Sequence, residues 1–195
     1  APPARGRRRA APPRRTPVPR RRGRTVRTPT VLQMEAVECG AASLAMVLAH
    51  YGRHVPLEEL RIACGVSRDG SRASNLLKAA RGYGLTAKGM QMDTAALAEV
   101  KAPAILFWEF NHYVVYDGTG RRLGRRGVYV NDPGKGRRFV PMEEFDASFT
   151  GVVLVLEPGE GFARGGRRPG IRGALPARLR GTAGALPVAV LASLL

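Results

Sequence analysis

Cysteine is scarce in this sequence, with two residues among 195, Cys39 and Cys64. Two cysteines cannot build the disulfide framework of a small secreted domain, so we expect reduced thiols. The two lie 25 residues apart and form no CxxC pair, so their spacing does not indicate a zinc site. No apolar run reaches the roughly 20 residues that a transmembrane helix needs, and the first 30 residues show no apolar centre of a secretory signal.

Acidic residues are also few, 15 against 32 lysines and arginines, which gives a net charge of +17 at pH 7. The excess lies at the two ends of the chain. Residues 1–30 contain 11 arginines and no acid, and residues 159–195 contain six arginines and one acid. Residues 31–158 hold 15 basic and 14 acidic side chains. The near-neutral middle argues against a nucleic-acid-binding domain, whose globular part would carry the positive charge.

The first segment, residues 1–27, consists mainly of Arg, Pro, Ala and Thr and is predicted to be a disordered tail. A solvated tail without a further role is one interpretation. Attraction to an anionic membrane surface is another, since each arginine near acidic lipid contributes roughly 1 kcal/mol. Nucleic-acid binding is the least favoured, because no aromatic residues are interleaved with the arginines.

The last segment begins with a Gly, Pro and Arg linker at residues 163–184 and continues into the apolar run ALPVAVLASLL at residues 185–195. These 11 residues are too short to span a bilayer. We expect the run to be the start of a truncated transmembrane helix, and the alternative is a short helix that folds back onto the core. The arginines just before it indicate that the preceding domain lies on the cytoplasmic side.

The middle of the chain has the patterns of a folded domain. Apolar residues recur at helical spacing within residues 41–51, and further short helices are predicted at 56–65, 74–84 and 93–100. Short β-type patterns, bounded by Gly, Pro, Asn and Asp, occur at residues 85–92, 104–110, 112–118, 127–132 and 151–157. Helices followed by adjacent strands predict an α+β domain with a mostly antiparallel sheet.

Cys39 lies where a polar run gives way to an apolar helical pattern. A thiol at a helix N-terminus is close to unpaired backbone amides and to the positive end of the helix dipole, and both favour the thiolate. Glu35 and Glu38 oppose this effect slightly, so a reactive thiol would need a cationic partner. Without such a partner, a cysteine on an apolar helix is more often a small buried side chain.

His112 stands at the start of one predicted strand, and Asp132 stands at the end of the next. If the two strands are antiparallel neighbours, both residues lie at the same edge of the sheet. Each has an ordinary alternative role, as a structural histidine and as an aspartate that starts a turn. Together with Cys39 they would supply the nucleophile, proton partner and orienting carboxylate of a cysteine peptidase.

Three stretches, LQMEAVECGAASLAMVLAHYG, NHYVVYDG and the segment at 131–162 that begins NDPGKG, resemble the cysteine peptidase domain of bacteriocin-exporting ABC transporters. The resemblance covers residues 28–162. It implies a papain-like fold, with N-terminal helices packed on the sheet, and cleavage of leader peptides after a double-glycine site. It also implies that Cys39 is the nucleophile, His112 the general base, Asp132 the third triad member and Gln33 a donor in the oxyanion hole.

The same resemblance implies that the peptidase needs no cofactor and that ATP binds only to a transporter portion absent from this chain. The expected partners are a precursor peptide with a double-glycine leader and a membrane with an anionic lipid surface, and no nucleic acid. The implied setting is a homodimeric transporter in a bacterial cell membrane, with the peptidase on the cytoplasmic face. The Arg-rich N-terminus and Glu38, where many relatives carry aspartate, depart from the family pattern.

Two other functions are compatible with parts of the sequence. One is a catalytically silent domain that only recruits cargo to an exporter, although such domains usually lack the cysteine or the histidine. The other is a basic nucleic-acid-associated protein. Three residues are expected to lie outside the chemistry: Cys64, His50 and His54. Trp108 is predicted to be either in the core or in a pocket wall.

Overall fold

The computed structural model describes residues 25–167. The sequence predictions for most of the N-terminal tail, for most of the linker and for the truncated transmembrane helix at 185–195 therefore lie outside the described residues. Within residues 25–167, no helix has both the length and the apolar character needed to cross a membrane.

Helices come first along the chain and strands dominate the second half, which confirms the predicted α+β class. The elements are η1 (Ala36–Glu38), α1 (Cys39–His50), α2 (Leu57–Ala63), α3 (Ala73–Gly82), β1 (Leu85–Gln91), α4 (Thr94–Leu97), β2 (Ala104–Trp108), β3 (His112–Arg122), β4 (Arg125–Asp132), β5 (Gly136–Pro141), α5 (Met142–Ser148) and β6 (Phe149–Pro158).

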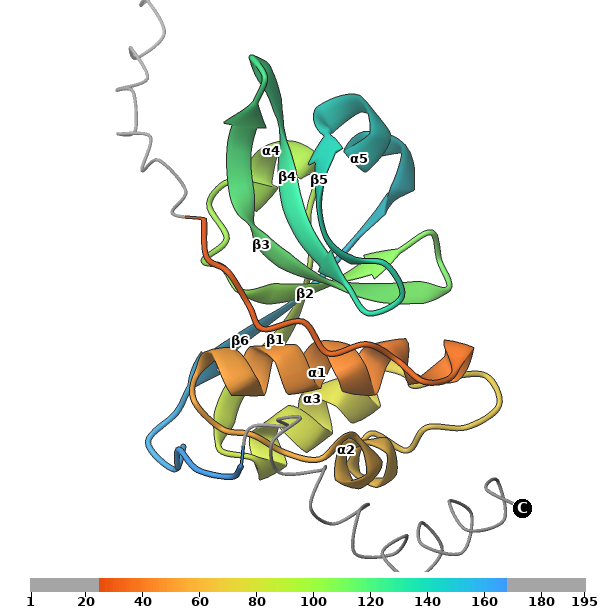
Figure 1. The fold of residues 1–195 in the computed structure, drawn as a ribbon, viewed down its shortest axis with the longest axis vertical. Coiled ribbons are helices and arrows are strands. Elements are labelled where there is room, and N and C mark those ends of the chain that lie inside the picture. The colour runs from red at the N-terminus through yellow and green to blue at the C-terminus, as the bar shows by residue number, and fades with distance from the viewer. Residues whose placement is uncertain (1–24, 168–195) are drawn as a thin grey trace, which may run out of the picture.

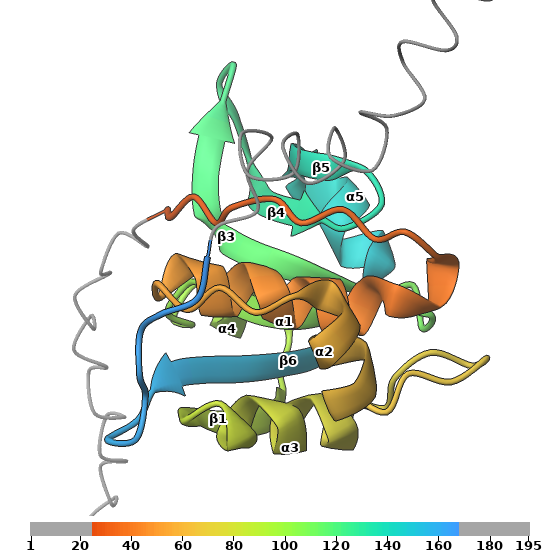
Figure 2. The ribbon, with the colours of Figure 1, turned by 60° about the horizontal axis from the view of Figure 1, so that its bottom comes forward.

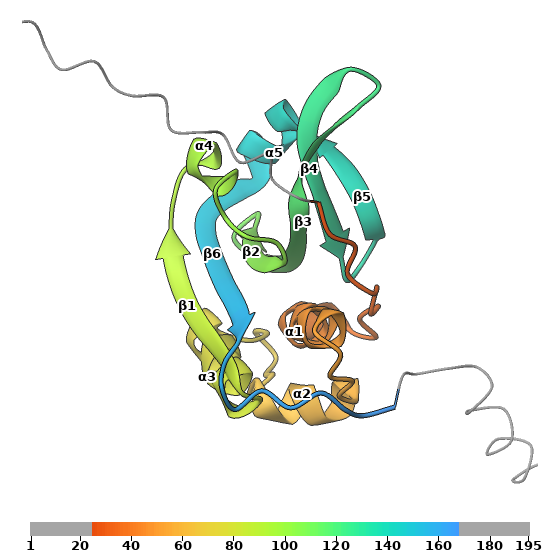
Figure 3. The same ribbon diagram turned by 90° about the vertical axis from the view of Figure 1, so that its left-hand side faces the viewer.

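The strands form one sheet in the order β1-β6-β2-β3-β4-β5, and every neighbouring pair is antiparallel. Helices α1, α2 and α3 cover one face, while α4 and α5 cover the other (Figures 1 and 3). Strand β3 contributes side chains to the hydrophobic clusters on both faces, because alternate residues of a strand point to opposite sides of the sheet. Tyr113 and Val115 belong to the cluster under α1, and Val114 and Tyr116 belong to the cluster under α4 and α5.

Helix α1 is the centre of the helical layer. All its residues from Cys39 to Leu48 are buried, so the helix is covered around its whole circumference rather than on one stripe. Gly40 allows its first turn to pack closely: a Cβ at that position would lie 3.1 Å from Leu76 on α3 and 3.3 Å from Tyr113 on β3. This close packing holds the start of α1 against the start of β3, where the candidate site lies.

Besides the single turn η1, two elements are absent from the sequence predictions, strand β5 and helix α5. Strand β5 carries two arginines in six residues, and only Val140 on it is fully buried, so it shows no clean alternation. Helix α5 is seven residues long and buries only Phe145. Elements this short and polar are fixed by contacts with the rest of the fold, not by their own periodicity.

Candidate active site

The site forms where three segments meet at one edge of the sheet: the start of α1, the beginning of β3 and the end of β4 (Figure 1). Strands β3 and β4 are antiparallel, with Val115 paired to Asn131, so the start of β3 and the end of β4 lie at the same end of the sheet. His112 and Asp132 therefore lie together, as their positions in the sequence predicted. The Nε2 atom of His112 is 2.9 Å from Oδ1 of Asp132.

Asp132 is held as a carboxylate. It is 2% exposed, and its Oδ1 also accepts a hydrogen bond of 2.8 Å from the Gly134 amide in the turn that follows β4. Burial acts to raise the pKa of Asp132. The hydrogen bonds from His112 and Gly134 and the positive charges of His112 and Arg138 outweigh that effect and lower the pKa below its usual value. The turn-starting role of this aspartate and its contact with the imidazole are thus combined in one side chain.

His112 lies between this carboxylate and the Cys39 thiol. Burial of the imidazole acts to lower the pKa of His112, but hydrogen bonds to Asp132 and Cys39 and the negative charges of both residues raise it to about 9. Because Nε2 contacts Asp132, Nδ1 is the nitrogen available to Cys39. The arrangement therefore supplies the cationic partner that the sequence left open for a reactive thiol.

Gln33 approaches the same site from the segment that precedes η1. Its backbone amide donates a hydrogen bond of 3.0 Å to the Pro133 carbonyl, and this bond connects Gln33 to the turn after Asp132. A Cβ built on Gly134 would lie 4.0 Å from the Gln33 side-chain carboxamide carbon and 3.4 Å from Oδ1 of Asp132. The Gln33 Oε1 is buried and has no hydrogen-bond partner among the described residues. The side-chain carboxamide of Gln33 thus lies near Asp132, with an Oε1 atom that no described residue uses.

Glu38 has a structural role that the sequence did not show. Its Oε2 accepts hydrogen bonds from the Met34 and Glu35 amides at 2.8 and 3.0 Å, and its Oε1 is 3.0 Å from Arg61 on α2. The carboxylate is 1% exposed. Instead of merely opposing the thiolate, Glu38 fixes the loop that carries Gln33 to the first turn of α1.

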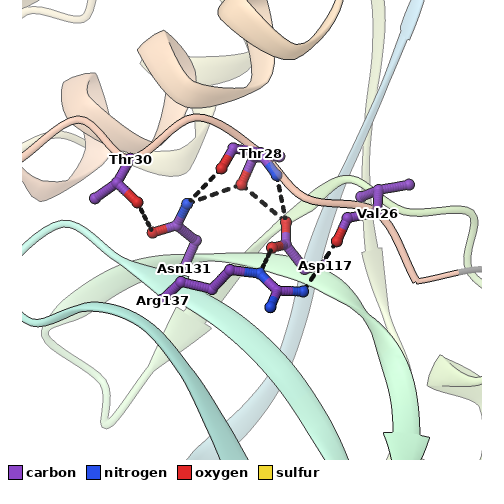
Figure 4. Close-up of polar contacts among 6 residues, drawn as sticks. All are labelled: Val26, Thr28, Thr30, Asp117, Asn131 and Arg137. Carbon is purple, nitrogen blue, oxygen red and sulfur yellow. Dashed lines mark hydrogen bonds and ion pairs between the residues drawn. The ribbon is translucent and has the colours of Figure 1, made fainter.

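A second anchor holds the segment upstream of Gln33, as Figure 4 shows. A β-bulge at Asp117 interrupts the β3–β4 register, and Asp117 is fully buried. Its carboxylate accepts hydrogen bonds from the Thr28 hydroxyl at 2.8 Å and from Nε of Arg137 at 2.6 Å. Asn131, immediately before Asp132, donates to the Thr28 carbonyl at 3.0 Å and accepts from the Thr30 hydroxyl at 3.0 Å.

This network explains the path of residues 25–35, which run along α1 before the chain turns into η1 (Figure 2). Sequence reasoning did not find its members. One signal was present: an aspartate inside the apolar strand HYVVYDG requires a partner once it is buried. The sequence did not identify that partner, because Thr28 and Asp117 are 89 residues apart.

The structure gives the positions of the residues that were expected to lie outside the chemistry. Cys64 is fully buried at the end of α2, and burial raises the pKa of its thiol to about 12. Trp108 is in the core, with its ring centroid 5.3 Å from that of Phe145. His50 is in the last turn of α1, and His54 follows that helix. No group of three or more His, Cys, Asp or Glu side chains within residues 25–167 is arranged to hold a metal ion.

Comparisons with known proteins identify the family of the chain and proteins of the same fold. The profile of the Peptidase C39 family matches residues 27–161. Among curated proteins, the probable microcin-H47 secretion/processing ATP-binding protein MchF of Escherichia coli is 34% identical over 137 residues, which is 70% of this chain and 19% of that protein. This chain thus spans about a fifth of the length of that relative.

Solved structures show the same fold. A double glycine motif protease from an AMS/PCAT transporter, crystallised with the leader peptide, is 53% identical, with a TM-score of 0.66 over 71% of this chain and 96% of that one. The peptidase domain of Streptococcus ComA, described as a bi-functional ABC transporter in a quorum-sensing pathway, is 25% identical, with a TM-score of 0.61 over 66% of this chain and 96% of that one.

Proposed function

Because the chain belongs to the Peptidase C39 family, we propose that residues 28–162 are a cysteine peptidase domain that removes the leader of bacteriocin-like precursors after a double-glycine site. The observation that carries this proposal is the position of His112, in contact with Asp132 on one side and interacting with Cys39 on the other. A histidine in this setting favours an imidazolium that stabilises the thiolate of a nucleophilic cysteine.

The proposed reaction is acyl transfer through Cys39. The thiolate attacks the carbonyl carbon of the second leader glycine, and the Gln33 side-chain amide together with a backbone amide donates to the oxyanion that develops. The His112 imidazolium gives its proton to the leaving amine. His112 then accepts a proton from water, which attacks the thioester and releases the leader, while Asp132 keeps the imidazole oriented throughout.

The demand for glycine follows from the burial of the nucleophile. Cys39 is 4% exposed, because the first turn of α1 is packed between α3 and β3. A peptide carbonyl can reach such a thiol only if the residues beside the bond carry little or no side chain. Two successive glycines meet this requirement and also give the substrate backbone the freedom to enter a narrow site.

A synthetic leader peptide with a Gly-Gly junction tests this proposal. We expect cleavage after the second glycine, located by mass spectrometry, and a large loss of kcat/KM when either glycine of the peptide is changed to valine. A matched valine substitution several residues downstream of the bond should have little effect. Equal cleavage of the Gly-Gly and Val-containing peptides would contradict the proposed specificity.

The role of Asp132 gives a second test, with a pH profile as its readout. A neutral amide can still orient imidazole, so Asp132→Asn should retain clearly more activity than Asp132→Ala.

The wild-type rate should fall as pH rises through about 9, where His112 loses its proton. Without the Asp132 charge the pKa of His112 drops, so the alkaline limb of Asp132→Asn should move to lower pH. Equal losses in both folded variants, or an unmoved limb, would contradict this role.

The wider setting is also proposed from the relatives. Their printed names describe secretion/processing ATP-binding proteins, of which this chain matches a small part. We infer that the domain belongs to a membrane exporter, with the peptidase on the cytoplasmic face, ATP bound by other parts of the protein and a homodimeric assembly. The precursor peptide and an anionic lipid surface are the proposed partners. The intact candidate triad argues against a silent cargo-docking domain, and the near-neutral middle argues against nucleic acid.

A further inference from the structure

The β3–β4 hairpin extends beyond the rest of the sheet, at the end of the molecule away from α2 and α3 (Figures 1 and 3). Its tip has the sequence RRLGRR at residues 121–126. Leu123 at the turn is 94% exposed, and the four arginines around it are exposed as well. An apolar residue at a protruding tip, surrounded by arginines, is an unusual surface for a domain whose chemistry lies elsewhere.

The charge of the hairpin tip is concentrated rather than scattered. Residues 31–158 contain 15 basic side chains, and four of these lie within the six residues of the tip. The remaining part of that range holds 11 basic against 14 acidic side chains and is therefore slightly negative. Among the described residues, one acid contacts the four arginines: Glu143, at 3.7 Å from Arg125.

The pairing of the arginines opposes folding of the tip. Arg121 lies directly across from Arg126, and Arg122 lies directly across from Arg125. Like charges at opposed positions of an antiparallel pair destabilise it. Leu123 adds backbone strain, since its φ of +49° lies in the left-handed region that favours glycine. These features weaken the hairpin by itself, and an anionic surface would relieve the repulsion and cover the leucine.

We propose that the hairpin tip at residues 121–126 docks on anionic lipid, with the arginines on the headgroups and Leu123 in the interfacial layer. Basic residues near acidic lipid and an apolar residue at the boundary contribute together to such binding. Nucleic acid is less favoured, because no aromatic side chain accompanies the arginines at the tip. This proposal rests on the proposed membrane setting of the domain, but not on its peptidase activity.

Two further observations make the tip suitable for docking. It lies at the opposite end of β3 and β4 from His112 and Asp132, so roughly 30 Å of strand separates it from the candidate site. A docked hairpin thus leaves the site open to a peptide. Thr25 also lies beside the strand here, with its methyl 3.7 Å from a Cβ built on Gly120. Residues 1–24, which precede Thr25 in the sequence, contain ten arginines.

Vesicle flotation of the 195-residue chain tests the proposal. The hairpin variant changes Arg121, Arg122, Arg125 and Arg126 to Gln. A matched control changes four exposed basic residues outside the hairpin, Arg68, Arg72, Lys78 and Lys88, to Gln and removes the same charge. On phosphatidylglycerol-containing vesicles we expect the hairpin variant to lose at least about tenfold in affinity and the control to lose much less. Neither protein should bind neutral phosphatidylcholine vesicles.

A second variant separates docking from folding. Leu123→Gly removes the apolar tip and relieves the left-handed strain, so it should weaken vesicle binding while the melting temperature stays the same or rises. Equal losses in the hairpin and control variants would assign binding to net charge alone and overturn the proposal. Loss of affinity for duplex DNA without loss of vesicle binding would overturn it in favour of nucleic acid. Cleavage of a soluble peptide by the hairpin variant, measured in parallel, reports on the peptidase separately.

Discussion

Replacing Cys39 by alanine is expected to reduce cleavage of a double-glycine peptide by on the order of a thousandfold or more, because no other group in the site can form the acyl intermediate. His112 and Asp132 would remain in contact, but they would have no thiol to activate. The measurement is single-turnover cleavage followed by mass spectrometry. The circular dichroism spectrum and melting temperature of the variant should show that the fold is kept, since alanine fits where a small thiol was buried.

Cys64→Ala is the matched control for that variant. Cys64 is fully buried, and the pKa of its thiol is raised to about 12, so it is protonated and inaccessible at neutral pH. This variant should therefore cleave the peptide at close to the wild-type rate. Persistent cleavage by Cys39→Ala, or a comparable loss in Cys64→Ala with the fold intact, would show that the nucleophile has been wrongly assigned.

Gln33→Ala is expected to lower kcat by about a hundredfold or more with little change in KM, because a donor to the oxyanion acts mainly in the transition state. The fold should be unaffected, since the backbone amide of residue 33 keeps its bond to the Pro133 carbonyl and the lost Oε1 has no partner among residues 25–167.

The other glutamine of the chain, Gln91, provides the control for this variant. It is exposed on β1, so Gln91→Ala should leave kcat and KM unchanged. If Gln33→Ala raised KM without lowering kcat, Gln33 would be a substrate-binding residue and not an oxyanion donor. If it lowered the melting temperature and kcat together, its role would be structural.

The elements with strong periodicity were predictable from the sequence, and so was the end of the sheet at which His112 and Asp132 meet. Cys39 at the start of an apolar helix, His112 at the start of a strand and Asp132 at the end of the next strand are local signals. Antiparallel pairing brings the last two to the same end of the sheet, where their side chains meet. Helix α1 begins at Cys39, slightly before the predicted range of 41–51, because η1 leads directly into it.

The support around the site was not predictable, because it depends on contacts between distant segments. Thr28 and Asp117 meet only because a bulge turns Asp117 out of the regular β3–β4 register, and Arg137 reaches the Val26 carbonyl across 111 residues of sequence. The sequence position of Glu38 also suggested a role different from the one the structure shows. Next to Cys39 in the sequence, it suggested repulsion of the thiolate, whereas its carboxylate contacts Arg61 and two backbone amides.

Alkylation of the folded domain with iodoacetamide between pH 5 and 9 tests most directly whether Cys39 is an activated nucleophile paired with His112. The predicted result is a single adduct on Cys39, located by peptide mapping, whose rate at mildly acidic pH exceeds that of an ordinary thiol. His112→Ala should lower that rate strongly. An adduct on Cys64 at a similar rate, or a Cys39 rate unchanged in His112→Ala, would contradict the proposed thiolate–imidazolium pair.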